Sequence, residues 1–557
     1  MSLNRFATIV ALFLCLGGFP HVRAQVAPDM ALLLASEGAA ALLRGQYEKA
    51  IVAYDEALKS PKLTDARKSN ILNDRGVALW RLKRYAEAIA DFNKAIELFS
   101  DFAMVFNNRG NVLMELGRYE EALADFNRAV TLAPGYGAGY NNRGNAYMVL
   151  KKYEEAFQDY NRAVALMGTN AVPFNGRGKA NAALGRPYAA LRDYGQALTL
   201  NAKYGGAHSN RATVYTSLER HDDAVTDLTE AISVSPELVP LYLARAKALA
   251  EIRKTNTAMK DLDKAVELQP NQPGPYIARG QLLLTLGSPE KAREDLTTAA
   301  NLDNTSADAF AYRAQAYQKL GQPEEAMADA NLAIELRPDN ADYLRIRAEL
   351  HEAQGRPQEA MADYQAALAA APGDKAVRAA MKKLGAEPPV TAEAVAIGPE
   401  VSGWIVSESS GRFVATNSKY PKLRVLLEMY GEGKPQILGW QVLKYELQGI
   451  GLLHYFSGNR ADGQKTEYVA IVDLWSNKVL AVEPEIWGNS HANWEWRQVS
   501  VAVTDPDGIT NEVRLRKPRP EEQVENSDPW FGSGGLFGGP SSSGGRRPRG
   551  IFDWLFR

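Results

Sequence analysis

Arginine and aspartate recur in this chain at a fixed distance from one another. Nine arginines stand 34 residues apart, and each is followed sixteen residues later by an aspartate. The pairs are Arg75/Asp91, Arg109/Asp125, Arg143/Asp159, Arg177/Asp193, Arg211/Asp227, Arg245/Asp261, Arg279/Asp295, Arg313/Asp329 and Arg347/Asp363. A guanidinium and a carboxylate form strong bidentate bonds, so we expect nine ion pairs. Because a paired guanidinium has little capacity left for a ligand, the pattern favours a structural role over an anion-binding stripe.

Asparagines form a second periodic row beside the first arginines. Asn73, Asn107, Asn141 and Asn175 each lie two residues before an arginine, and Asn111, Asn145 and Lys179 lie one helical turn later. An amide donates and accepts, so such a row can bond the backbone of an extended partner. The alternative is that the asparagines only cap or solvate helix starts. At the equivalent later positions stand Ser209, Leu243, Ile277 and Ala311, which predict a more apolar lining.

Patterns typical of catalysis or of metal binding are missing from the sequence. There is no G-x-S-x-G, H-E-x-x-H, P-loop or nucleophilic cysteine pattern, and His454 and His491 lack metal-ligand spacing. Six tryptophans gather late in the chain: Trp404, Trp440, Trp475, Trp487, Trp494 and Trp496. They could stack on sugars, but packing is the commoner use of such residues. We therefore expect no enzyme, no cofactor and no metal.

A repeat of small residues must position these side chains. Alanine recurs at Ala50, Ala88, Ala122, Ala156, Ala190, Ala224, Ala258, Ala292, Ala326 and Ala360, with a second alanine seven residues after each and Gly or Ala twelve residues before. Small residues let two helices pack closely, and large residues at helical spacing lie between them. One such helix pair cannot bury its apolar face alone, so neighbouring pairs must stack.

Residues 103–134 resemble the tetratricopeptide repeat. The matching residues are Phe106, Gly110, Gly117, Tyr119, Ala122, Phe126, Ala129 and Pro134. The resemblance covers ten copies over residues 30–372 and implies a mainly α fold, a TPR superhelix of the α-α solenoid type. It also implies a concave groove that holds a protein or peptide partner, without catalytic activity. Where the family usually has leucine, repeats two to ten carry the paired arginines.

Beyond the repeats the periodicity changes. Residues 373–385 read as a capping helix, 386–400 as a linker and 401–517 as a small all-β domain. Expected strands cover 412–416, 423–430, 436–447, 467–474, 479–482, 499–504 and 512–516, with hairpins at 476–478 and 505–508. About seven such strands indicate a sandwich or a barrel.

The two ends of the sequence predict export and a docking tail. Residues 1–24 read as a signal peptide cleaved between Ala24 and Gln25. Residues 518–557 read as a disordered tail that ends in arginines and the aromatic residues Phe552, Trp554 and Phe556. We expect this tip to dock a partner, the chain's own groove or an anionic membrane surface.

Together these features predict a scaffold in the periplasm or outside the cell. It would bind protein partners through its concave groove and assemble envelope components. A net charge of −2 argues against a nucleic-acid binder. The alternative is a β domain that binds or cleaves cell-wall glycan and is recruited by the repeats. The sequence leaves the oligomeric state open.

Overall fold

The computed structural model describes residues 30–385 and 395–514, except for short gaps at 410, 431–432, 444–448, 461, 475, 488–489, 498–499, 506–507 and 509. The chain divides into two compact units, residues 1–142 and 143–557. Within the described residues, none of the helices is both long enough and apolar enough to cross a membrane.

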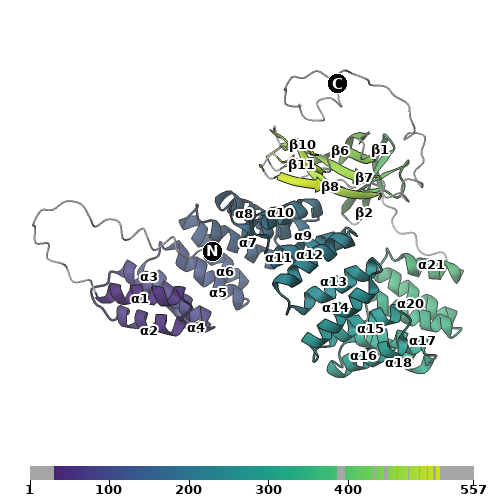
Figure 1. Ribbon diagram of the computed structural model, residues 1–557, viewed down its shortest axis with the longest axis horizontal. Coiled ribbons are helices and arrows are strands. Elements are labelled where there is room, and N and C mark those ends of the chain that lie inside the picture. Colours follow the sequence, from purple (N-terminus) through teal and green to yellow (C-terminus); the bar gives the residue numbers. More distant parts are fainter. Residues whose placement is uncertain are drawn as a thin grey trace, which may run out of the picture. The chain divides into compact units, whose positions relative to one another are not determined.

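Between residues 30 and 370, all of which the structure describes, twenty helices follow one another as ten antiparallel pairs, one pair for each predicted repeat (Figure 1). The pairs are α1/α2 (Met30–Leu43, Tyr47–Leu58), α3/α4 (Asp65–Arg81, Tyr85–Leu98), α5/α6 (Ala103–Glu115, Tyr119–Leu132), α7/α8 (Gly137–Val149, Tyr153–Leu166), α9/α10 (Ala171–Ala183, Pro187–Leu200), α11/α12 (Gly205–Ser217, His221–Val234), α13/α14 (Val239–Glu251, Thr255–Leu268), α15/α16 (Pro273–Thr285, Pro289–Leu302), α17/α18 (Ala307–Lys319, Pro323–Leu336) and α19/α20 (Ala341–Ala353, Pro357–Ala370). A shorter helix, α21 (Lys375–Lys383), follows and packs on α20. The predicted fold class, a TPR solenoid followed by a small β region, is confirmed.

The two helices of a repeat meet at a small residue. In the third repeat a Cβ added to Gly110 would lie 2.7 Å from Cε1 of Phe126, which is fully buried. The same contact joins Gly178 to Tyr194 in the fifth repeat, where the added Cβ would lie 2.6 Å from the ring. Glycine at these positions lets an aromatic ring fill the space between the two helices.

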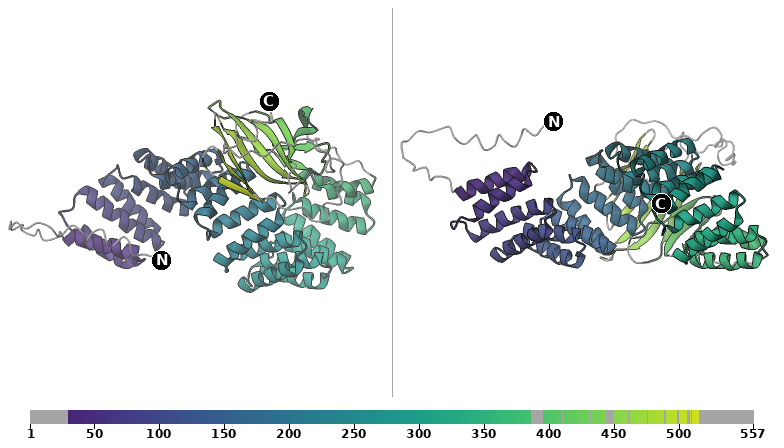
Figure 2. Two further views of the ribbon diagram at one scale, coloured as in Figure 1. Left: turned by 45° about the horizontal axis from the view of Figure 1, so that its top comes forward. Right: turned by 90° about the horizontal axis from the view of Figure 1, so that it is seen from below.

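Among the residues described after the repeats, twelve strands form three antiparallel sheets (Figure 2). The four-stranded sheet contains β1 (Val395–Val401), β2 (Trp404–Ser409), β3 (Arg412–Asn417) and β4 (Arg424–Leu426) in that order. The five-stranded sheet contains β5 (Gln436–Leu443), β6 (Ile450–Asn459), β7 (Lys465–Asp473), β8 (Lys478–Trp487) and β9 (Ser490–His491), and the three-stranded sheet contains β10 (Asn493–Arg497), β11 (Ser500–Thr504) and β12 (Thr510–Arg514). Within each sheet, strands that are neighbours in the sequence pair with one another.

The structure has more strands than the sequence predicted. Strand β1 lies partly within the expected linker, and β2, β6, β9 and β10 were not predicted. Strand β6 is buried along most of its length, so its sequence lacks the alternation of apolar and polar residues that reveals a strand with one wet face. The predicted strand over 423–430 is shortened to the three residues of β4, since residues 427–430 leave the sheet.

Candidate partner-binding site

The nine predicted Arg–Asp pairs all form, so this prediction is confirmed. In eight of them the guanidinium donates from Nε and Nη2 to the two carboxylate oxygens at 2.6–2.9 Å; in the fifth repeat the Arg177 bonds to Asp193 measure 2.7–3.1 Å. Each pair joins the first helix of a repeat to the second. The bidentate geometry occupies the Nε–Nη2 edge of the guanidinium and leaves Nη1 for another acceptor.

The remaining nitrogen of many of these arginines reaches the preceding repeat. Nη1 donates to a polar side chain in Arg109/Asn93, Arg177/Asn161, Arg245/Thr229, Arg279/Asp263 and Arg347/Asn331, at 2.6–3.0 Å. Each acceptor stands two residues after the aspartate of its own repeat. Sequence reasoning missed this second partner, although the polar residue at that spacing was its signal. The arginines therefore connect repeats as well as helices, which supports their structural role.

The predicted asparagine row is mostly inside the array. Asn73, Asn107, Asn141 and Asn175 are all buried. Amide bonds connect neighbouring repeats at three places: Asn108 Nδ2 donates to Asn73 Oδ1 at 2.8 Å, Asn142 to Asn107 at 2.9 Å and Asn210 to Asn175 at 3.0 Å. These hydrogen bonds connect the first helices of successive repeats. Neither interpretation of the sequence included this structural role for the asparagines.

The other predicted site residues are more accessible. Asn111 is half-buried, whereas Asn145 and Lys179 are exposed. Asn145 Oδ1 accepts a hydrogen bond from the hydroxyl of Tyr160 at 2.7 Å. Partner binding by any of these residues stays a prediction. Phe552, Trp554 and Phe556, like the predicted signal peptide, lie outside the described residues.

A large open hollow lies on the first helices of repeats eight to ten. Its volume is about 610 Å³, and every residue that lines it belongs to α15, α17 or α19. Three amides, Gln281, Gln315 and Gln318, line it together with Tyr312, Lys319 and Glu349. The lining is therefore more polar than the sequence predicted, since Ala311 is buried among the helices instead of facing the hollow.

The β-rich region packs on repeat five and its neighbours. Phe157 of α8 and Tyr188 of α10 belong to the same apolar cluster as Trp404, Tyr430 and Tyr468 of the β-rich region. Three arginines cross this contact, which we call the junction. Arg186 Nε donates to the Met429 carbonyl at 3.0 Å, Arg220 Nη1 donates to the Leu480 carbonyl at 2.9 Å, and Arg192 pairs with Glu483 and Asp505 at 3.3 and 3.6 Å.

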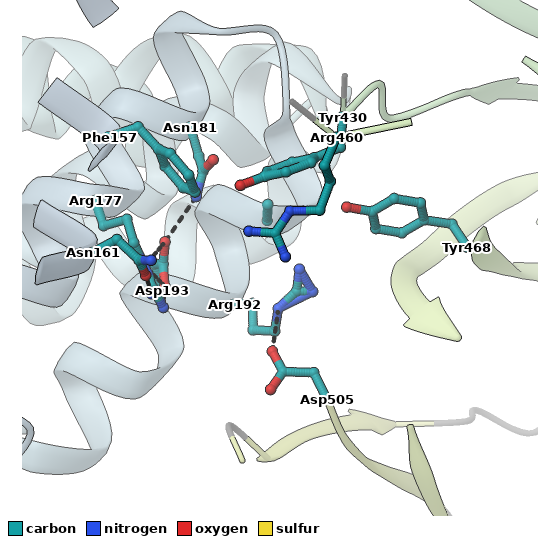
Figure 3. A pocket seen from close by; sticks show the side chains of 11 residues that line it. Phe157, Asn161, Arg177, Asn181, Arg192, Asp193, Tyr430, Arg460, Tyr468 and Asp505 are labelled. Carbon is teal, nitrogen blue, oxygen red and sulfur yellow. Dashed lines mark hydrogen bonds and ion pairs between the residues drawn. The ribbon is translucent and has the colours of Figure 1, made fainter. Parts of the chain in front are cut away.

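A small cavity of about 50 Å³ remains at the junction. Figure 3 shows Arg192, Arg460, Tyr430, Tyr468 and Asp505 around it, with Asn181 on the side of the repeats. This space is large enough for a few water molecules. The sequence predicted a linker followed by a separate β domain, so it did not predict this contact between the β-rich region and the repeats.

Three tryptophans of the β-rich region have side chains that the structure describes, and these three are placed for packing. Trp404 is fully buried, and Trp494 is buried with its Nε1 donating to Glu485 at 2.7 Å. Trp440 is half-buried and meets Trp404 edge-on, with ring centroids 4.9 Å apart. His454 is buried 2.9 Å from Glu467. In the described part of the chain, no three His, Cys, Asp or Glu side chains are grouped so that they could hold a metal ion.

Comparison with known proteins identifies the helix pairs. Models of families described as tetratricopeptide repeat match residues 69–102, 103–136, 138–170, 206–238, 239–272 and 312–375. Among curated proteins, none matches the chain.

Several solved structures have similar helix pairs. One is the APC/C heterotetramer Cut9–Hcn1, at 16% identity over 64% of this chain and 76% of that chain, with a TM-score of 0.39. YrrB, described as a TPR protein with an unusual peptide-binding site, is 26% identical over 32% of this chain and 92% of its own, with a TM-score of 0.28. PilF of Pseudomonas aeruginosa is 18% identical over 38% of this chain and 97% of its own, with a TM-score of 0.34.

Proposed function

We propose that this chain, which is built mainly of tetratricopeptide repeats, is a scaffold that holds a protein partner against the first helices of repeats eight to ten. The observation that carries the proposal is the hollow of about 610 Å³ lined only by α15, α17 and α19. Clefts of this size that combine a few polar groups with apolar surface are where proteins bind their partners and ligands.

The chemistry of the hollow fits a polypeptide partner. Gln281, Gln315 and Gln318 each carry both a donor and an acceptor, so they can bond the backbone of an extended segment. Tyr312 supplies a large, rigid contact surface beside them. Lys319 and Glu349 carry opposite charges, so the lining does not select strongly for one sign of charge. In the early repeats, by contrast, the buried asparagine amides are bonded within the array.

We further propose that the scaffold works in the periplasm or outside the cell and brings envelope components together. The support is the sequence of residues 1–24, whose positive residue, apolar run and Val22-Arg23-Ala24 ending are typical of a signal peptide. Fractionation of cells that express the chain with and without residues 1–24 tests this location. Retention of both forms in the cytoplasm would contradict it.

Site-specific photo-crosslinking in cells tests the binding surface. A crosslinking amino acid placed at Gln315 or Gln318 should trap a defined protein, because both side chains line the hollow. Gln365, an exposed glutamine on the second helix of repeat ten, is the matched control position. The same pattern of adducts at Gln365, or no adduct at either groove position, would contradict the proposal.

A further inference from the structure

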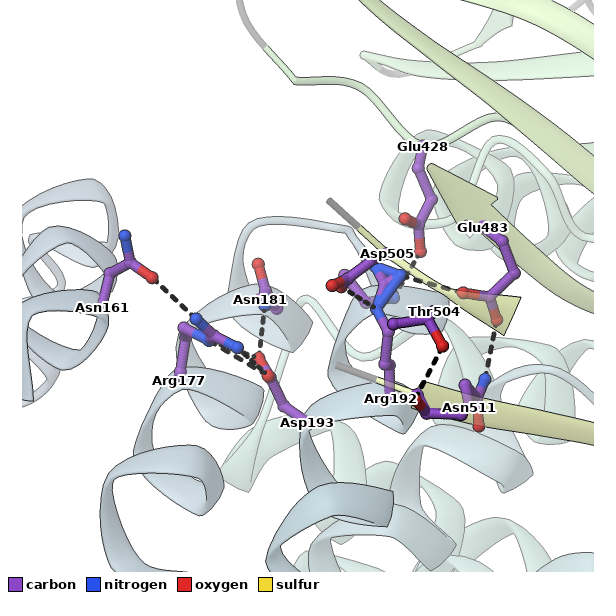
Figure 4. Close-up of polar contacts among 12 residues, drawn as sticks. Asn161, Arg177, Asn181, Arg192, Asp193, Glu428, Glu483, Thr504, Asp505 and Asn511 are labelled. Carbon is purple, nitrogen blue, oxygen red and sulfur yellow. Dashed lines mark hydrogen bonds and ion pairs between the residues drawn. The ribbon is translucent and has the colours of Figure 1, made fainter. Parts of the chain in front are cut away.

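The junction contains a group of three buried carboxylates beside a single arginine. Three carboxylates meet there, from Glu428 in the segment after β4, Glu483 in β8 and Asp505 after β11, and they are 1%, 1% and 8% exposed. Arg192 of α10 is the guanidinium that pairs with Glu483 and Asp505 (Figure 4). Arg192 pairs with two of these acids, whereas Arg186 and Arg220 at the same junction are bonded to backbone carbonyls.

Glu428 is held by the helix rather than by the arginine. Its Oε1 accepts the backbone N–H of Ala189 at 2.7 Å, in the first turn of α10. Its Oε2 is buried without a hydrogen-bond partner among the residues that the structure describes. A buried carboxylate oxygen with no donor is costly when charged and is satisfied more easily when it carries a proton.

The groups around Glu428 do not cancel its charge. Tyr188 of α10, Tyr455 of β6 and Tyr468 of β7 surround it with neutral phenols. Arg186, just before α10, is bonded to the Met429 carbonyl and to Glu154, and Arg220 is bonded to Asp223 and the Leu480 carbonyl. Arg192 attracts the negative charge of Glu428, but Glu483 repels it.

We propose that the junction between repeat five and the β-rich region is proton-dependent, tighter in mildly acidic than in alkaline solution, and that Glu428 takes up the proton. The proposal adds regulation of this contact to the scaffold and does not depend on which partner the hollow binds. The β-rich region would then hold repeat five more firmly when the surroundings become acidic.

The direction follows from proton linkage. Burial raises the pKa of Glu428 from 4.5 to about 7, with Arg192 and the backbone N–H groups of Ala189 and Tyr188 opposing the rise. Burial also raises the pKa of Glu483. A group whose pKa is higher in the closed junction stabilises it fully below pH 4.5 and loses that contribution as the pH rises through 7. For these values the closing equilibrium constant falls about tenfold between pH 6 and pH 8.

Hydrogen exchange of the Ala189 amide in the full chain measures this equilibrium, because that N–H is bonded across the junction. After correction for the intrinsic exchange rate, its protection factor should fall about tenfold from pH 6 to pH 8. In Glu428→Gln, which keeps an acceptor oxygen but cannot ionise, the change should stay within about twofold. Glu237→Gln, which removes an exposed carboxylate from a loop between repeats, should behave like the wild type.

Equal protection of Ala189 at both pH values in the wild type would overturn the proposal. So would a tenfold change that persists in Glu428→Gln, since another group would then carry the proton. If the glutamine variant does not fold, Glu428→Asn is the second neutral replacement that keeps an acceptor oxygen, and it is held to the same expectation.

Discussion

His208 occupies in repeat six the position held by Phe174 in repeat five and Tyr242 in repeat seven. The ring is buried, and both of its nitrogens face acceptors. Nδ1 lies 2.9 Å from Asp227 Oδ1 and Nε2 lies 3.0 Å from the Ala202 carbonyl. A neutral imidazole has a single N–H, so only the doubly protonated ring can donate both bonds. The bond to Asp227 accordingly raises the pKa of His208 above its usual 6.5.

A charged His208 makes repeat six less stable in alkaline solution. Its raised pKa means that its stabilisation is complete below pH 6.5 and is lost as the pH rises through the folded-state pKa. His208→Tyr should reduce this pH dependence by about 1 kcal/mol, because a phenol stays neutral there. Tyr242 shows that a tyrosine can bond the equivalent carbonyl, of Pro236, at 2.9 Å. Urea unfolding of the wild type and of His208→Tyr at pH 6 and pH 9 checks this prediction. An equal loss of unfolding free energy in both proteins between the two pH values would contradict it.

Helix pairs in this array match a small residue to a large one. Glycine faces a ring in the first five repeats, as at Gly110 and Phe126. In repeats six and seven the small residue is Ala212 or Ala246, and leucine stands sixteen residues later at Leu228 and Leu262. In these seven repeats a larger small residue accompanies a smaller partner, which limits the change of volume between the helices, whereas Gly280/Leu296, Ala314/Ala330 and Ala348/Tyr364 in repeats eight to ten do not follow this matching.

This matching predicts coupled effects in the third repeat. Gly110→Ala should destabilise the chain by about 1–3 kcal/mol, because the new Cβ would lie 2.7 Å from the Phe126 ring. Phe126→Leu alone should also cost about 1–3 kcal/mol, since it leaves a void. The double variant recreates the pairing of repeats six and seven, so its loss should be smaller than the sum. Denaturant unfolding of the four chains gives the coupling energy, and strictly additive losses would argue against volume matching.

Elements that repeat were predictable from the sequence, whereas single elements were not. Each helix pair is seen ten times, so the spacing of Ala122 and its equivalents fixed the helices and the arginine pairs. The strands occur once, and β6 carries a nearly continuous apolar run with no periodicity to identify it. The hydrogen bonds between asparagines were not predicted for another reason: they join residues 35 positions apart in different repeats, such as Asn73 and Asn108.

At the scale of the whole chain, the second helix of repeat five begins without an acid in its first turn, as does that of repeat seven. Repeats three, four and six carry two acids in the first turn of that helix, as at Glu120 and Glu121, but repeat five has Tyr188 and Ala189. The departure is visible in the sequence. Its structural role could not be predicted, because Glu428, the residue that the helix start binds, is 239 residues away along the chain.

Restoring an acid to repeat five should therefore open the junction. Ala189→Glu places a carboxylate beside the buried Glu428 and fills the space that the β-rich region needs, so both repulsion and overlap oppose the contact. Hydrogen exchange in the segment 426–430 should rise about tenfold or more, while the helices of repeats eight to ten stay protected. Thr257→Glu is the matched control, because Thr257 holds the same position in repeat seven and is exposed. Unchanged exchange in Ala189→Glu, or an equal rise in Thr257→Glu, would show that repeat five is not specialised to hold the β-rich region.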